Sequence, residues 1–328
     1  ELYLYSLDSN TNDDYTARIK SIDAKFFSID HLSITQRIEL IRSHELDLAI
    51  DLMGYTKGNN FILFANRIAP IQISYLGYPG TTGSDCMDYI IADKFLIPHD
   101  MKKYYSEKVI YLPLTYQCND DKLPKCNQTN PFIKDDQFKD KYVFTCFNSS
   151  YKISPLEFDI WMNLLRRVEQ SILWLYESSS ECKSHLIQSA QLRGIDSSRL
   201  FFAKALPLKD HILRHRNADL FLDTFNYSAG ATAFISLKAA IPVVCYEGKS
   251  YTSRMSSSIL KSLGLTSLVA KNFSEYEDIA FNLATNERFS SEIKDKLYDL
   301  NQNSDVFNSN KFVKDYESLL TQVYLNHA

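Results

Sequence analysis

Short apolar runs alternate with longer amphipathic stretches along almost the whole chain. Runs that hold β-branched and aromatic residues predict strands, whereas apolar residues spaced three and four positions apart predict helices. In the first half, strands are expected at residues 2–6, 25–29, 46–52, 72–76, 89–92 and 109–112, with a helix at 34–43. In the second half, strands are expected at residues 142–147, 172–176, 200–203, 220–223, 243–246 and 268–270. This alternation is typical of α/β proteins in which helices cover parallel sheets.

Residues 117–141 are rich in Asn, Asp, Lys, Gln and Pro, which predicts a surface connection between two compact bodies. We therefore expect an N-terminal Rossmann-like lobe at residues 1–116, a connection at 117–141 and a C-terminal nucleotide-binding lobe at 142–328. Each lobe is expected to be doubly wound, and the two are expected to face one another across a cleft. Helices without strands are expected after residue 274, among them 289–300 and 312–324. The first strand follows no glycine-rich turn, so the first lobe is expected to be incomplete at its start.

The composition excludes several classes of protein. Hydrophobic residues make up 45% and charged residues 23% of the 328 residues, which is typical of a packed globular protein. The net charge of -4 provides no basic surplus for a phosphate backbone, so nucleic-acid binding is not expected. No apolar run reaches the roughly 20 residues that span a bilayer, and no signal peptide pattern opens the chain. A cytoplasmic protein without a membrane span is expected.

The cysteines are dispersed, without a C-x-x-C pair or a nearby histidine at metal-ligand spacing. No metal site is therefore expected, and free thiols in a reducing compartment are the expected state. A disulfide between Cys118 and Cys126 is the alternative, since both lie in the polar segment.

Residues 147–155 join a strand to a helix and hold the first candidate for chemistry. Ser154 is the expected N-cap, Pro155 opens the first turn, and Glu157 completes a capping box. Lys152 stands just before this helix, so its ammonium and the helix N-terminus could together hold a diphosphate. The alternative is a solvated loop lysine beside a purely structural cap.

Further along, residues 223–232 form a second junction of strand and helix, built from small residues that let a ligand approach the backbone. Between the two junctions, His211 and Arg214 share one face of a short helical segment and could flank a base. A solvated basic face is the alternative. In the first half, residues 54–58 and 76–83 are turn-rich segments after strand ends, where α/β sheets place ligand loops. Ordinary tight turns are the alternative there.

The amino-acid sequence of several segments resembles that of the catalytic region of protein O-GlcNAc transferases. The order and spacing match as well, and the resemblance covers nearly the whole chain. It is carried by residues 54–58 (GYTKG), 69–72 (APIQ), 76–83 (LGYPGTTG), 87–93 (MDYIIAD), 105–108 (YSEK), 112–113 (LP), 147–155 (FNSSYKISP), 218–224 (ADLFLDT), 253–254 (SR) and 263–264 (LG). The chain is similar to bacterial-type and SPINDLY-like members of glycosyltransferase family 41.

The resemblance implies a GT-B fold and transfer of N-acetylglucosamine from UDP-GlcNAc to Ser or Thr of proteins, with inversion and without metal or cofactor. A protein or peptide acceptor and tetratricopeptide (TPR) repeats upstream of this chain are the implied partners. By position, Lys152 would be catalytic and contact the diphosphate. The other implied donor contacts are Asn148 and Ser149 in the same segment, His211 and Arg214 at the uracil, Thr232 at phosphate, and Leu76 and Gly77 at the sugar.

The chain departs from the family pattern at several positions. Ile235 stands where an acidic residue usually grips the ribose, and Leu208 stands where animal enzymes have a lysine, although Lys209 could substitute. Gly230 and Ala231 replace a His-Thr pair of the animal form. Glu39 and Arg42 stand where animal enzymes have Asp and His, and the segment with an active-site histidine is absent, so no general base is assigned.

Two alternatives follow from these departures. One is a nucleotide-binding or protein-binding relative that has lost turnover. The other is a transferase with a different UDP-sugar or acceptor, for example one that moves glucose to asparagine.

Overall fold

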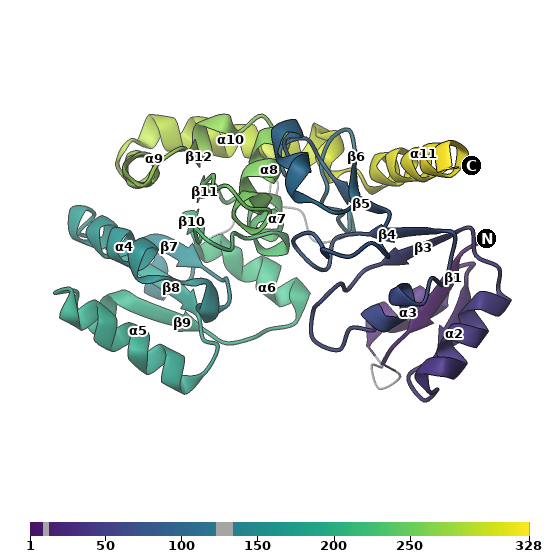
Figure 1. The fold of residues 1–328 in the computed structure, drawn as a ribbon. Helices are drawn as coiled ribbons and strands as arrows, with labels where there is room; N and C mark the ends of the chain where they lie inside the picture. The colour runs from purple at the N-terminus through teal and green to yellow at the C-terminus, as the bar shows by residue number, and fades with distance from the viewer. Residues whose placement is uncertain (9–12, 123–133, 328) are drawn as a thin grey trace. The chain divides into compact units, whose positions relative to one another are not determined.

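The computed structural model describes residues 1–8, 13–122 and 134–327 (Figure 1). By its contacts the chain divides into two compact units. The first holds Glu1–Ala92, His99–Tyr111 and Ser318–Ala328, and the second holds Asp93–Pro98 and Leu112–Glu317. By these contacts, residues 93–98 and 112–116 belong to the second unit and the end of the chain, from Ser318, to the first. The domain limits 1–116, 117–141 and 142–328 therefore stay a prediction.

The first unit contains the six strands that the sequence predicts, all paired in parallel. They form two ladders, β1-β2 and β3-β4-β5-β6, rather than one continuous sheet. Both ladders share one core, in which Tyr5 and Phe27 pack against Ile29, Ile41 and Ala49. The strands are β1 (Tyr3–Ser6), β2 (Lys25–Ser28), β3 (Leu48–Asp51), β4 (Ile71–Ser74), β5 (Tyr89–Ala92) and β6 (Lys108–Tyr111).

Helices α1 (Asp14–Lys20), α2 (Ile34–Ser43) and α3 (Phe61–Ala65) belong to this unit as well. A capping box begins α2, because the backbone N–H of Ser33 donates to Gln36 Oε1 at 3.0 Å and the N–H of Gln36 donates to Ser33 Oγ at 3.3 Å. The end of α11 (Ser309–His327) completes the unit, where His327 Nδ1 lies 3.3 Å from the hydroxyl of Tyr89.

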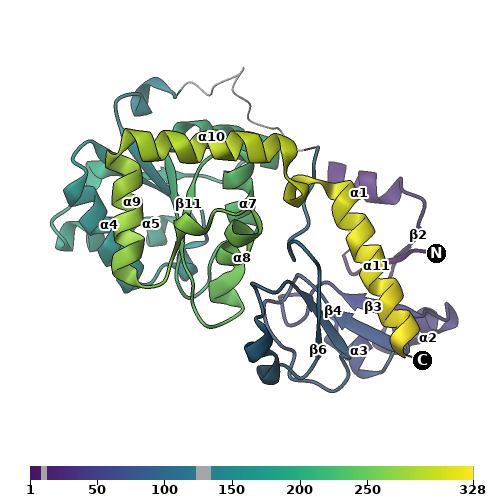
Figure 2. The ribbon, with the colours of Figure 1, turned by 90° about the horizontal axis from the view of Figure 1, so that it is seen from above.

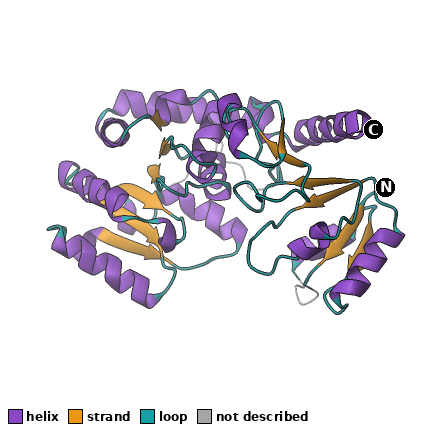
Figure 3. Cartoon of the chain, in the orientation of Figure 1, coloured by secondary structure: helices purple, strands orange, loops and turns teal. Residues whose placement is uncertain are grey.

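The second unit is built on a parallel sheet of order β12-β11-β10-β7-β8-β9 with helices on either side (Figure 3). All six strands predicted here occur, as β7 (Tyr142–Cys146), β8 (Ser171–Tyr176), β9 (Leu200–Ala203), β10 (Leu220–Leu222), β11 (Val243–Tyr246) and β12 (Val269–Ala270). The helices are α4 (Pro155–Arg167), α5 (Ser180–Leu192), α6 (Leu208–Arg214), α7 (Ala231–Lys238), α8 (Met255–Ser262), α9 (Phe273–Thr285), α10 (Glu287–Asn303) and the first part of α11, residues 309–317.

The helical end of the second unit confirms the expectation for the residues after 274. Figure 2 shows α9 beside α4 and β11, followed by α10. The buried hydroxyl of Tyr276 on α9 accepts a hydrogen bond from Trp161 Nε1 on α4 at 3.2 Å and donates to the carbonyl of Asp223 at 3.0 Å. A helix far along the chain thereby supports the loop that follows β10.

Candidate functional site

The strand order of the second unit reverses between β7 and β10, which pair directly through Phe144 and Leu220. Ligands of open α/β sheets bind outside the carboxyl ends of the strands at such a switch point. The loops after these two strands are residues 147–153 and 223–230, so the two junctions identified from the sequence leave the sheet side by side. The buried side chain of Asn148 joins them, because its Nδ2 donates to Asp223 Oδ1 at 3.0 Å and to Thr224 Oγ1 at 2.8 Å.

Asp223 organises the second of these loops. Its Oδ1 also accepts from the backbone N–H groups of Thr224 and Ala229, both at 2.8 Å. Burial raises the pKa of Asp223 to about 6, although donors from Ser256, Ala229, Asn148 and Thr224 oppose the shift. The carboxylate is therefore mostly ionised at neutral pH and lies beneath the loop, where it acts as an anchor.

The capping box predicted at α4 is present, since Glu157 Oε1 accepts from the backbone N–H of Ser154 at 2.8 Å and its other oxygen accepts from the Ser154 hydroxyl. The Glu157 carboxylate already takes up part of the positive field of this helix start. Lys152 ends the short 3-10 helix Ser150–Lys152 just before α4, so it lies in the loop that leaves the switch point.

The ammonium of Lys152 lies against the loop after β10. Its Nζ is 3.4 Å from the carbonyl oxygen of Ser228 and 3.7 Å from the ring centroid of Tyr227. Burial lowers the pKa of Lys152, and the nearby charge of Asp223 raises it in part. Within the described part of the chain, Lys152 forms no ion pair with an acidic residue. Its charge is therefore available to an anionic ligand.

An open pocket of about 200 Å³ lies beside the loop after β7, and three residues predicted from the sequence meet there. The pocket is lined by Phe147, Ser149, Tyr176, Ala205, Leu206, His211 and Arg214. The ring of Phe147 packs edge-on against the His211 ring, with centroids 5.3 Å apart, and the Arg214 guanidinium lies 5.2 Å from the Phe147 centroid. His211 and Arg214 thus share a face, as predicted, and that face lines a pocket rather than only solvent.

Hydrogen bonds select the tautomers of two histidines near this pocket, and burial keeps both rings neutral. His211 Nδ1 accepts from Arg214 Nε at 2.9 Å, which leaves the hydrogen of the neutral ring on Nε2. Burial, assisted by Arg214, lowers the pKa of His211 to about 4. His215 is fully buried, its Nδ1 donates to the carbonyl of His211 at 2.8 Å, and burial lowers its pKa to about 3. Both rings are neutral at pH 7.

His215 should make the second unit sensitive to acid. In the unfolded chain His215 binds a proton below its ordinary pKa of 6.5, whereas in the folded chain it does so only below about pH 3. The neutral ring therefore contributes its full share to the free energy of unfolding above pH 6.5. That contribution is lost as the pH is lowered from 6.5 toward 3. Between pH 7 and pH 5 the loss at this group is about 2 kcal/mol. Trp161 and Trp174, both in the second unit, report its urea unfolding by fluorescence.

The variant His215→Leu should show a smaller loss of stability between pH 7 and pH 5 than the unmodified protein. His185→Gln is the matched control, because His185 is exposed on α5 and its replacement should leave the pH dependence unchanged. Equal slopes for His215→Leu and the unmodified protein would contradict the neutral state of His215.

Thr232 is the second residue of α7, half-buried, and follows the N-cap Gly230. The packing around position 230 favours glycine, which the local sequence could not predict. A Cβ atom there would lie 2.6 Å from Met255 Cε and 3.2 Å from the Tyr116 hydroxyl, so a larger residue requires the end of the Met255 side chain to move. Ile235, one turn further along α7, is half-buried and presents no oxygen to a ribose.

Of the other departures, Leu208 begins α6 and is half-buried, whereas Lys209 is exposed. In the first unit, Arg42 donates to the carbonyl of Asn66 and Glu39 is exposed. Among the described residues, neither side chain has a contact that would make it a general base.

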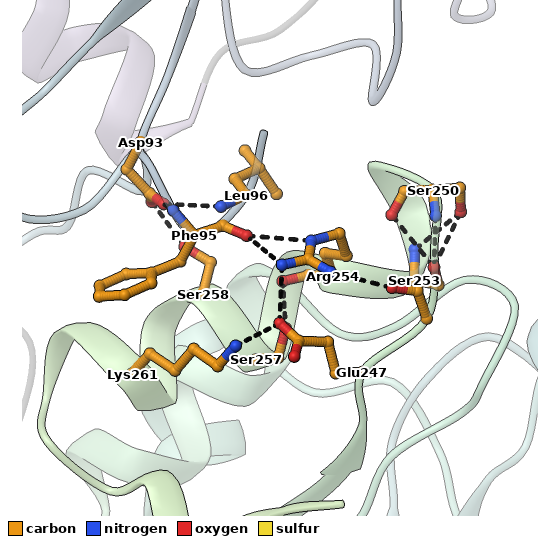
Figure 4. Close-up of polar contacts among 11 residues, drawn as sticks. Asp93, Phe95, Leu96, Glu247, Ser250, Ser253, Arg254, Ser257, Ser258 and Lys261 are labelled. Carbon is orange, nitrogen blue, oxygen red and sulfur yellow. Dashed lines mark hydrogen bonds and ion pairs between the residues drawn. The ribbon is translucent and has the colours of Figure 1, made fainter. Parts of the chain in front are cut away.

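The loop after β11 is held by Arg254, which the sequence marked only through the family motif (Figure 4). Its Nε and Nη2 donate to the carbonyl of Phe95 at 3.0 and 2.9 Å, and Nη1 donates to the carbonyl of Gly248 at 3.1 Å. Glu247 pairs with Arg254 at 2.8 Å and also with Lys261. In the same loop, the carbonyl of Thr252 accepts from the N–H and hydroxyl of Ser228, so this cluster supports the loop beside Lys152.

In the first unit, the predicted sugar-contacting residues Leu76 and Gly77 follow β4. Leu76 adopts a φ of 66°, in the left-handed region that disfavours a side chain. A Cβ atom on Gly77 would lie 1.9 Å from the carbonyl oxygen of Leu52, so only glycine fits. The backbone at Leu76 is therefore strained, and the contact of Leu76 and Gly77 with a sugar stays a prediction.

The rest of this loop is held by a buried carboxylate. Glu107 accepts from Thr81 Oγ1 and from the backbone N–H of Thr82, both at 2.6 Å. The hydroxyl of Tyr55 donates to the carbonyl of Thr82 at 2.8 Å. The motifs at residues 54–58, 76–83 and 105–108, recognised separately in the sequence, therefore form one hydrogen-bonded group.

Replacing Gly77 by alanine should destabilise the first unit by about 2 kcal/mol, because the new methyl group overlaps backbone atoms that cannot rotate away. Hydrogen exchange of the β3 amides measures the effect. Gly80→Ala is the control in the same loop, since a Cβ there meets only the Tyr78 ring at 3.5 Å. Equal protection in the two variants would show that the loop is not constrained at Gly77.

Five of the cysteines lie in the described part of the chain. Cys86, Cys118, Cys146, Cys182 and Cys245 are free thiols, while the alternative disulfide involves Cys126, which lies outside the described residues. In residues 1–8, 13–122 and 134–327, no group of three or more His, Cys, Asp or Glu side chains is arranged to hold a metal ion. No helix of the part that the structure describes is long and apolar enough to cross a membrane.

The chain is similar to several known proteins. The probable UDP-N-acetylglucosamine–peptide N-acetylglucosaminyltransferase SEC of Arabidopsis thaliana is 30% identical over 334 residues, covering 100% of this chain and 34% of that protein. The corresponding Caenorhabditis elegans transferase is 24% identical, covering 99% of this chain and 38% of that protein. This chain thus spans about a third of the length of these curated relatives.

The chain is similar to solved structures of glycosyltransferases as well. A mutant O-GlcNAc transferase of Thermobaculum terrenum superposes with a TM-score of 0.87 and 27% identity, covering 100% of this chain and 63% of that one. An Anabaena protein in complex with UDP-glucose has a TM-score of 0.65 at 14% identity, covering 97% of this chain and 91% of that one, and shows the fold alone. The predicted α/β fold class of GT-B type is confirmed. Since the sequence also matches the model of "Glycosyl transferase family 41" over residues 1–128 and 133–316, the chain belongs to that family.

Proposed function

We propose that this chain acts in the catalytic region of an inverting, metal-independent glycosyltransferase that moves N-acetylglucosamine from UDP-GlcNAc to Ser or Thr of proteins. The observation that carries the proposal is the ammonium of Lys152, which stands at the sheet's switch point without an acidic partner among the described residues. An anion such as the diphosphate of UDP is the ligand that this charge favours. The names of the curated relatives support the donor and the peptide acceptor.

In this proposal, the acceptor hydroxyl attacks the anomeric carbon of the sugar while the bond from that carbon to the UDP oxygen breaks. Negative charge develops on the departing diphosphate, where the Lys152 ammonium stabilises it more strongly than in the ground state. The acceptor oxygen loses its proton in the course of transfer, and no base is assigned to that step.

The remaining site residues have binding roles in the proposal. The pocket of Phe147, His211 and Arg214 would take the uracil, with His211 offering Nε2–H as a donor. Ser149 lines the same pocket and Asn148 fixes the loop above it. Thr232 would contact phosphate through the start of α7. Leu76 and Gly77 of the first unit would contact the sugar.

The partners and location remain parts of the same proposal. A peptide acceptor fits the names of the curated relatives. TPR repeats elsewhere in the polypeptide and a cytoplasmic location are implied by the family resemblance alone. A relative that binds nucleotide without turnover is the second candidate, and Ile235 and Leu208 are the observations that favour it.

Two measurements test the proposal. Calorimetry with UDP should show binding, and its absence would remove the nucleotide site. Intact-mass analysis of an acceptor protein, after separate incubation with UDP-GlcNAc and UDP-glucose, should show the mass increment of N-acetylhexosamine only. A hexose increment would change the donor, and UDP binding without any increment would favour the non-catalytic candidate.

A further inference from the structure

The ring of Tyr227 lies directly against the ammonium of Lys152, with Nζ 3.7 Å from its centroid. A second contact of this ammonium is the carbonyl of the next residue, Ser228, at 3.4 Å. Both contacts come from the loop after β10, whereas Lys152 comes from the loop after β7. The position of the ammonium is therefore set by a neighbouring loop rather than by its own.

That loop is held on both sides of the ring. The carbonyl of Tyr227 accepts from Thr224 Oγ1 at 2.7 Å, and Thr224 Oγ1 in turn accepts from Asn148 at 2.8 Å. On the other side, the N–H and hydroxyl of Ser228 donate to the carbonyl of Thr252 at 2.9 and 2.7 Å. These bonds fix the backbone on both sides of the half-buried ring, and thereby the position from which the ring reaches the ammonium.

We propose that Tyr227 is a positioning residue for Lys152, whose ring face holds the ammonium at the switch point and keeps its charge free for a diphosphate. The inference rests on the proposed function and adds to it the residue that places the cation. An aromatic face attracts a cation through its quadrupole, yet carries no net charge. A carboxylate at the same place would neutralise Lys152 and compete with the ligand.

The ring also favours the charged form of Lys152. The titratable groups that act on this ammonium are Asp223 and the thiol of Cys146, besides the burial that lowers its pKa. The Cys146 thiol is itself fully buried, which raises its pKa and keeps it neutral. Replacing the ring by an aliphatic side chain retains the burial and removes an attraction, so the pKa of Lys152 should fall further.

The test compares Tyr227→Phe, which keeps the ring face, with Tyr227→Leu and Tyr227→Met, which remove it. Tyr104→Leu is the matched control, because Lys103 lies 5.1 Å from the centroid of this exposed ring, outside the site. Nuclear magnetic resonance of labelled lysine side chains, with the Lys152 signal assigned from Lys152→Ala, gives its acid dissociation constant without any ligand. Calorimetry gives the affinity for UDP.

Loss of the ring should raise the acid dissociation constant of Lys152 about threefold or more and weaken UDP binding about three- to tenfold. Tyr227→Phe and Tyr104→Leu should stay within about twofold of the unmodified protein in both measurements. Tryptophan fluorescence shows which aliphatic variant is folded and can be compared.

An unchanged dissociation constant in the folded aliphatic variant would overturn the inference. So would an equal loss in Tyr227→Phe, because the phenol hydroxyl would then be the active group. A change in the dissociation constant without a change in UDP affinity would overturn the role in diphosphate binding. If the unmodified protein binds no UDP, the proposed function fails, while the resonance measurement still decides whether the ring holds the charge.

Discussion

Replacing Lys152 by alanine is expected to lower the rate of sugar transfer about 10²–10³-fold, the effect typical of losing one group that stabilises charge in the transition state. The fall should appear mainly in kcat, because the charge on the diphosphate grows as the bond to the sugar breaks. Steady-state transfer to an acceptor peptide measures it. The unfolding midpoint should change little, because burial already disfavours the charged form of this side chain.

The matched control for this prediction is Lys271→Ala, since Lys271 is an exposed lysine of the same unit. It should retain the rate of the unmodified protein. Full activity in Lys152→Ala would remove the mechanism proposed here. A fall in activity together with a collapse of the unfolding midpoint would assign Lys152 to structure instead.

Replacing Arg254 by methionine is expected to lower the free energy of unfolding of the second unit by about 3 kcal/mol. Methionine fills much of the space of the arginine stem but cannot donate a hydrogen bond, so the carbonyls of Phe95 and Gly248 lose their donors. Glu247 keeps Lys261 as a partner, which limits the loss. Urea unfolding followed by tryptophan fluorescence measures it, because Trp161 and Trp174 both belong to this unit.

Arg288→Met is the control for Arg254, because Arg288 is 89% exposed and pairs with Glu292 along its own helix. That variant should unfold at the same urea concentration as the unmodified protein. If Arg254→Met does so too, the cluster in Figure 4 does not stabilise the second unit.

Local patterns in the sequence were enough to predict every strand that the structure describes, because most of these strands are short runs of apolar residues. The capping box of Ser154 and Glu157 is equally local, and so is the shared face of His211 and Arg214. These features depend on residues a few positions apart. The roles of Lys152 and of the other site residues in catalysis and binding stay predictions until they are tested.

Contacts between residues far apart in the sequence could not be predicted from local patterns. Lys152 meets Tyr227 because the sheet places β7 next to β10, and Arg254 meets Phe95 across a gap of 159 positions. Burial shifts the pKa of Asp223 and of His215, and burial is a property of the packed chain rather than of its local sequence. The left-handed backbone of Leu76 was missed because most leucines avoid it.

Helix α11 begins in the second unit and ends in the first, where His327 meets Tyr89. During translation, residues 318–327 leave the ribosome after all of the second unit has been made. The second unit can therefore fold before the chain is finished. The first unit receives the end of α11 only afterwards, although most of its residues are synthesised earlier. A polypeptide that stops before residue 318 should consequently fold its later half and leave its earlier half open to proteases.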